Sequence, residues 1–317
     1  MLKYPLLICF GEIALEIFYY LSLLLAQTSN TVKQYAMKVC GKRAPGSFNS
    51  ICINMVRSVI CLPISAAIWL IADGGGTTAT GNFIIVAAGL GNAFSMFTWI
   101  WSSSLVPLML IECVSMIGAL VIPLLLAPYL YNGDSVSLIQ WIGCILIFAS
   151  IFFFINKDGG KKKQGSVFKK VMVIGLYMIS AMINTIFKKY YTFHITEKNL
   201  GSIEYFTFIS FLSALGLFLV LFAVFYKKER KANGGSVELP FKKVRIYILI
   251  AAITLYVSEL FATYASQLPS AIYYPLTRAI LIVGTFLLEV MVFKDKVTLK
   301  KIIGFIVVIA GIILVNL

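Results

Sequence analysis

The feature that most constrains this chain is a series of apolar runs, each roughly 20 residues long, separated by short polar segments. A helix needs about 20 apolar residues to cross the hydrocarbon core of a bilayer. In lipid, only helices and closed barrels satisfy their own backbone hydrogen bonds. We therefore expect an all-α integral membrane protein with ten transmembrane helices. They are predicted at residues 16–36, 48–72, 82–103, 106–129, 137–155, 171–189, 203–226, 246–265, 271–293 and 302–317.

Composition supports the bilayer over water as the solvent. Of the 317 residues 60% are hydrophobic and 13% are charged, whereas soluble domains carry roughly 25% charged residues. The formal net charge of +14 raises the question of nucleic acid. The basic residues lie between the apolar runs, where orientation in the membrane explains them. We therefore expect the lipid bilayer, and no nucleic acid, as a partner.

Motifs for other chemistries are missing from the sequence. The six cysteines show no paired spacing, so neither a disulfide framework nor a metal site is predicted. The chain has no Walker A loop, which excludes transport driven by its own ATP hydrolysis, and no Gly-x-Ser-x-Gly element. We expect no cofactor. The first apolar run resembles a signal peptide, but Glu12 and Glu16 interrupt it, so we expect it to be retained.

The chain contains an internal repeat. Asp134, Val136, Ser137, Leu138, Ile142 and Gly143 match Asp295, Val297, Thr298, Leu299, Ile303 and Gly304, which lie 161 positions later. Asn30-Thr31-Val32 matches Asn184-Thr185-Ile186, which lies 154 positions later. We interpret the chain as one transmembrane domain with repeat one at 16–155, a linker at 156–170 and repeat two at 171–317, preceded by an extension at 1–15. Five spans in each copy force the second to enter from the opposite side, which gives an inverted repeat.

These motifs resemble a known family. An apolar span, a turn with an acidic residue, then Val-Ser/Thr-Leu and Ile-Gly at the start of the last helix of each half resemble the drug/metabolite transporter (DMT) superfamily, EamA-like branch. Both turns carry Asp where the family usually has Glu. The resemblance implies ten helices in two inverted repeats and transport of solutes that range from sugars to drugs and lipid-linked sugars. It also implies cytoplasmic termini.

The distribution of basic residues predicts the opposite orientation. The loops expected after spans one, five, seven and nine hold 21 of the 27 Lys and Arg residues, and the other side holds 4. Basic residues concentrate in cytoplasmic loops, so this asymmetry places both termini outside the cytoplasm. We expect a multi-pass protein of the plasma (inner) membrane.

Arg278 is the first candidate site residue, because ionisable groups inside a membrane are costly and are usually functional. On an α-helix, Tyr274, Thr285 and Glu289 lie within about 40° of Arg278. This polar stripe on an otherwise apolar span is expected to face a cavity. The alternative is that Arg278 only forms an ion pair between helices.

Glu112 and Glu259 are the expected counter-charges of Arg278. A carboxyl group in a poorly solvated cavity takes up a proton more readily, as a proton-coupling site requires. Protons are therefore a candidate coupling ion. The alternative is that both carboxylates are fixed partners of the arginine.

Further candidates are uncharged. Asn92, Ser95 and Trp99 form a stripe on span three that suits a flat or amphipathic solute, although such stripes are also common in packing. Asn30 and Asn184 stand at equivalent repeat positions and either line the cavity or bond across helices. Arg57 is expected to snorkel to the membrane surface. One basic and two acidic groups would suit an amino-acid-like, cationic or amphipathic solute.

Three functions fit this pattern. The first is a secondary active transporter, an exporter of a small organic solute that works by alternating access as a monomer or homodimer. The second is an integral membrane enzyme or flippase-like protein acting on a lipid-linked substrate. The third is a non-transporting membrane assembly subunit. The sequence favours the first, and we expect no enzymatic activity.

Overall fold

The computed structural model describes the backbone of residues 4–72, 75–103, 105–106, 108–130, 137–154, 167–195, 198, 200–232, 237, 239–294, 297–315 and 317. These residues form helices joined by short connections, without a strand among them. In chain order the elements are α1 (Tyr4–Arg43), α2 (Ser47–Ala72), α3 (Ala79–Ser103), α4 (Leu108–Met116), η1 (Ile117–Val121), α5 (Ile122–Leu130), α6 (Leu138–Phe154), α7 (Val167–Phe193), α8 (Ile203–Ala232), α9 (Phe241–Ala265), α10 (Ser270–Leu287), η2 (Leu288–Val292) and α11 (Leu299–Val315).

The all-α class is confirmed, and the helices lie where the apolar runs predict them. The π-helical segments η1 and η2 continue directly from α4 and α10, so the described residues form ten helical segments. Seven of these are long and apolar enough to cross a membrane, as in a multi-pass membrane protein. Helices α6 and α11 have only 17 residues each. It stays a prediction that all ten segments cross the membrane.

The outer faces of the helices expose large apolar side chains. Phe83 on α3, Val220 on α8 and Ile306 on α11 are 68%, 62% and 60% exposed. Soluble monomers rarely expose broad apolar patches. These faces therefore suit contact with lipid tails.

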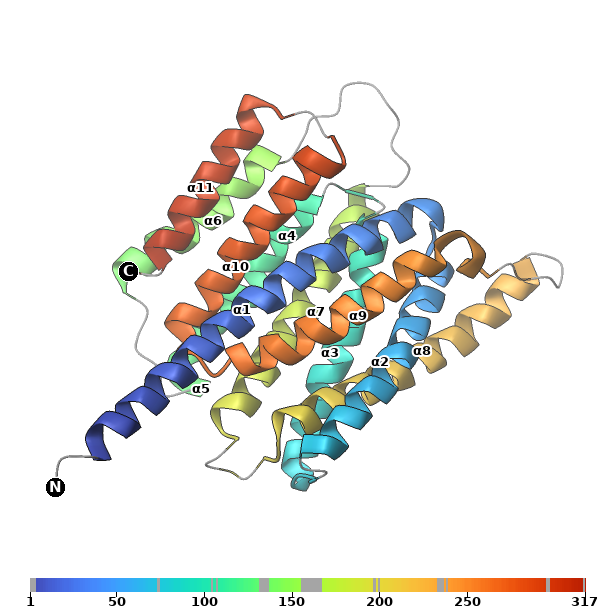
Figure 1. The fold of residues 1–317 in the computed structure, drawn as a ribbon. Helices are drawn as coiled ribbons and strands as arrows, with labels where there is room; N and C mark the ends of the chain where they lie inside the picture. Colours follow the sequence, from blue (N-terminus) through green and yellow to red (C-terminus); the bar gives the residue numbers. More distant parts are fainter. Residues whose placement is uncertain are drawn as a thin grey trace.

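The helices pack in pairs that leave the polar residues at the centre. The most extensive contacts are those of α1 with α9, α3 with α7, α2 with α8, and α6 with α11. Figure 1 shows the α6–α11 pair at one edge of the bundle and the α2–α8 pair toward the other, with the remaining pairs between them. The middle of the molecule is thus enclosed by α1, α3, α7, α9 and α10.

Two glycines allow α7 to approach its neighbours closely. A Cβ atom on Gly91 of α3 would lie 2.9 Å from the backbone nitrogen of Asn184, and one on Gly118 of η1 would lie 2.3 Å from the carbonyl oxygen of Met178. Contacts this short require glycine, since any other residue would push the helices apart. The close crossing brings the polar middle of α7 against α3 and η1.

Four of the lysines that were counted with the loops lie in helices with their side chains in the interior of the bundle. Lys33 and Lys38 belong to α1, and Lys188 and Lys189 to α7. Lys38, Lys188 and Lys189 are buried. The count was wrong for these four because it assigned every lysine near the end of a span to the membrane surface, whereas a helix can continue through charges that point inward. Removing them changes the counts from 21 and 4 to 19 and 2, so the charge asymmetry remains.

Several predicted features lie outside the described residues. They include the turn residues Asp134 and Asp295 and most of the linker at 156–170, of which residues 167–170 belong to α7. The extension at 1–15 is helical from Tyr4 onward and continuous with α1.

Candidate functional site

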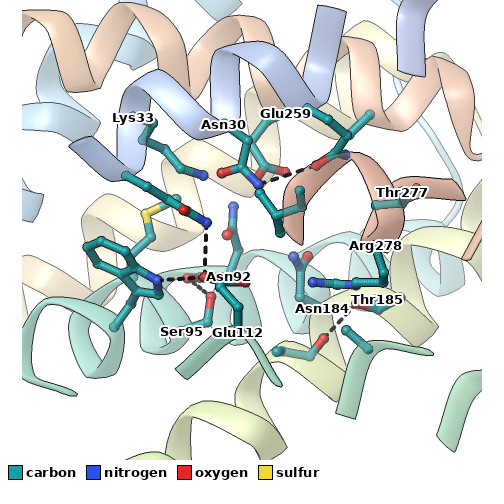
Figure 2. Close-up of a pocket in the computed structure, with 18 of the residues that line it drawn as sticks. Asn30, Lys33, Asn92, Ser95, Glu112, Asn184, Thr185, Glu259, Thr277 and Arg278 are labelled. Carbon is teal, nitrogen blue, oxygen red and sulfur yellow. Dashed lines mark hydrogen bonds between the residues drawn. The ribbon is translucent and has the colours of Figure 1, made fainter. Parts of the chain in front are cut away.

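A polar cavity of about 150 Å³ lies at the centre of the bundle (Figure 2). A single water needs about 10–15 Å³ by the same kind of measure, so the cavity has room for a small organic molecule. Its lining comes from α1, α2, α3, α4, η1, α7, α9 and α10. Segments from both ends of the chain therefore meet at one site.

The cavity brings together nine of the eleven candidate residues from the sequence. They are Asn30, Asn92, Ser95, Trp99, Glu112, Asn184, Glu259, Tyr274 and Arg278. Thr285 and Glu289 are not among the lining residues. Thr285 lies behind the lining of the cavity. Its hydroxyl donates to Oε1 of Gln34, which is a lining residue, over 2.9 Å. Glu289 is buried in η2.

Three further charged side chains line the cavity and alter its charge balance. These are Lys33, Arg57 and Lys188. Sequence reasoning counted the two lysines with the charges on the two sides of the membrane and expected Arg57 to snorkel, but Arg57 is 1% exposed and donates to Oδ1 of Asn54 over 2.6 Å. In place of one basic and two acidic groups, the site has four basic and two acidic groups.

A sequence signal for the lysines does exist. Lys33 follows Asn30 by three residues, and Lys188 follows Asn184 by four. Residues three and four apart share a helix face. An asparagine that lines a cavity therefore predicts the same for a basic residue one turn later, and both asparagines are followed by such a residue.

Glu259 is held by an ion pair. Its Oε2 atom lies 2.5 Å from Nζ of Lys188, and the two side chains are 17% and 8% exposed. The adjacent Lys189 turns elsewhere and donates to the carbonyl oxygens of Ser266 and Leu268, at 2.6 and 2.5 Å. Lysines near a helix C-terminus commonly bond the last carbonyls in this way. One lysine thus neutralises the carboxylate while its neighbour fixes the end of α9 to α7.

Glu112 is held by neutral donors. Its Oε1 atom accepts from Nε2 of Gln34 at 2.9 Å and from Nε1 of Trp99 at 3.2 Å, and its Oε2 atom accepts from the Ser115 hydroxyl at 3.3 Å. The described residues place no Lys or Arg within ion-pair distance of this carboxylate. Because Glu112 is only 2% exposed, it is a buried carboxyl group that can gain a proton without breaking an ion pair.

The remaining wall is aromatic and amide-rich. Trp99, Tyr177, Tyr273 and Tyr274 all contribute, and aromatic rings bury large area while their polar atoms find partners. In Figure 2, Asn184 and Arg278 lie on one side of the cavity and Lys33 on the other. With this arrangement, polar groups on opposite sides of the cavity can bind the two ends of one solute.

Comparison with known proteins gives information on the fold of this chain and none on the chemistry of the site. No protein-family model matches the chain, and no curated protein matches it. A solved structure described only as "Crystal structure of protein" superposes with a TM-score of 0.64, covering 96% of this chain and 98% of its own, at 14% sequence identity. This chain is therefore similar in fold to a solved structure over nearly its whole length.

Proposed function

We propose that this chain is a secondary active transporter of the DMT superfamily, EamA-like, which exports a small organic solute across the plasma (inner) membrane by alternating access. The observation that carries the proposal is the central cavity, where six charged side chains meet inside a largely apolar bundle. Buried charges in membrane proteins usually mark the path of a substrate or ion. A purely structural bundle would have no need of an open, charged space.

The packing pattern supports an inverted repeat. Exchanging the halves maps α1, α2, α3 and α6 onto α7, α8, α9 and α11, and α4–η1–α5 onto α10–η2. The α1–α9 pair then maps onto the α7–α3 pair, and α2–α8 and α6–α11 map onto themselves. Transporters built in this way bind their solute between the repeats, which is where this cavity lies.

The π-helical segments offer places for the required movement. Helical segments four and nine each contain one, at 117–121 and 288–292. Single-turn π-helices are rare and frequent at functional sites, and kinks form at them and at prolines. Pro123 follows η1, and Pro275 lies within α10. Bending there would open the cavity to one side or the other.

Flux through the purified protein tests the proposal. A thermal-shift screen of metabolites identifies a ligand, and proteoliposomes loaded with that ligand should take up its labelled form in a saturable way. Trp99→Leu should abolish this uptake, whereas Phe83→Leu, on the lipid-facing side of the same helix, should leave it intact. Folded protein without flux would contradict the proposal and favour an assembly subunit, and conversion of a lipid-linked substrate would favour an enzyme.

A further inference from the structure

We infer that the transported solute is a small organic anion carrying two negative charges. The inference rests on the proposed transport function and names the substrate class. It arises from the charges that line the cavity, four basic and two acidic, which leave the site at +2 when all six are ionised.

The two acidic groups are already occupied. Glu259 is paired with Lys188 at 2.5 Å, and the oxygens of Glu112 accept from Gln34, Trp99 and Ser115. Neither carboxylate presents a free negative end to the cavity. A cationic solute would meet repulsion from the basic groups and would have to displace these donors to reach a carboxylate.

Three basic groups remain for a solute. Lys33, Arg57 and Arg278 come from three different helices, α1, α2 and α10. Within the described part of the chain, none of them has a carboxylate at ion-pair distance. The Nε atoms of both arginines are buried without a hydrogen-bond acceptor. The site therefore contains more hydrogen-bond donors and more positive charge than the acceptors and carboxylates of the chain satisfy.

An anion would supply what is missing. A buried charge without a partner is strongly unfavourable, and guanidinium groups match the geometry of carboxylate and phosphate oxygens. Two negative charges balance the excess. The volume of about 150 Å³ favours a soluble phosphate monoester or dicarboxylate over the head of a two-chain lipid.

Thermal unfolding of the full-length protein in uncharged detergent tests this at constant ionic strength. Millimolar sulfate, succinate and glycerol 3-phosphate should raise the Tm, whereas glycerol and putrescine should not. Arg278→Gln should weaken the apparent Kd for the dianions about tenfold to hundredfold, the range for a lost charge-assisted hydrogen bond. Lys198→Gln, on an exposed lysine, is the matched control. Glu112→Gln removes a negative charge and should tighten binding.

Several results would overturn the inference. A Tm that does not respond to any dianion, a response that Arg278→Gln leaves unchanged, or a response to phosphatidic acid alone would each contradict a soluble dianion. If Arg278→Gln does not fold, Arg278→Lys keeps the charge without the planar fork and should weaken binding. Dianion binding without flux would reject the transport function alone, and flux of a neutral or cationic solute without dianion binding would reject this inference alone.

Discussion

Glu259→Gln is expected to lower the free energy of unfolding by about 3–5 kcal/mol, the range for a buried ion pair that loses one partner. The substitution leaves Lys188, which is 6% exposed, as a buried cation without its carboxylate. Denaturation of the purified variant in detergent measures the loss.

The double variant Lys188→Met with Glu259→Gln should regain most of that stability, because no unpaired charge is left behind. Glu16→Gln, an exposed carboxylate on α1, should change little and serves as the control. If the single variant is as stable as the wild type, the ion pair is not a structural element. The same holds if the double variant is no better than the single one.

Glu112→Gln is expected to abolish accumulation driven by a proton gradient while exchange of labelled for unlabelled solute continues. The amide oxygen can still accept from Trp99 and Gln34, but the side chain no longer takes up a proton. With the membrane potential clamped at zero, one proton per solute supports about tenfold accumulation for each pH unit. In proteoliposomes the variant should bring this ratio to about one.

Glu112→Asp, which keeps the carboxyl group, should retain part of the accumulation. Loss of both accumulation and exchange in Glu112→Gln would assign the residue to solute binding or folding. Retention of both would remove Glu112 from the coupling mechanism. The contrast with Glu259 is structural, since that carboxylate is already held by a lysine.

The positions of the helices were predictable because each depends on a local property, the length of an apolar run. The contacts of charged residues near the ends of these runs were not. From the sequence alone, Lys33 and Lys188 can be interpreted equally well as loop residues or as helix residues that face the interior. Only the neighbouring helices decide which, and hydropathy contains no information on neighbours.

The candidate stripe on α10 shows a second limit. Thr285 lies on the predicted face, but seven residues of helix place it roughly 10 Å along the axis from Arg278, past the cavity. Glu289 lies in η2, where the π-helical repeat differs from the 3.6 residues per turn assumed for the stripe. Angular position on an ideal helix therefore predicts that Tyr274, one turn from Arg278, faces the cavity, but it takes no account of distance along the axis.

The proposed inverted repeat is indicated in the sequence by short matches such as Asn30 with Asn184. Asn30 and Asn184 both line the cavity. The sequence could not show that α1 packs on α9 and α7 on α3, because these contacts join residues far apart in the chain, such as Gly91 and Asn184.

Alternating access is tested most directly by the accessibility of the cavity from each side of the membrane. With the six native cysteines replaced, a cysteine at Asn184 should react with a membrane-impermeant thiol reagent in vesicles of either orientation, and solute should slow both reactions. A cysteine at the lipid-facing Phe83 should not react in either. Labelling of the Asn184 position from one side only, with and without solute, would contradict a cavity that opens alternately to both.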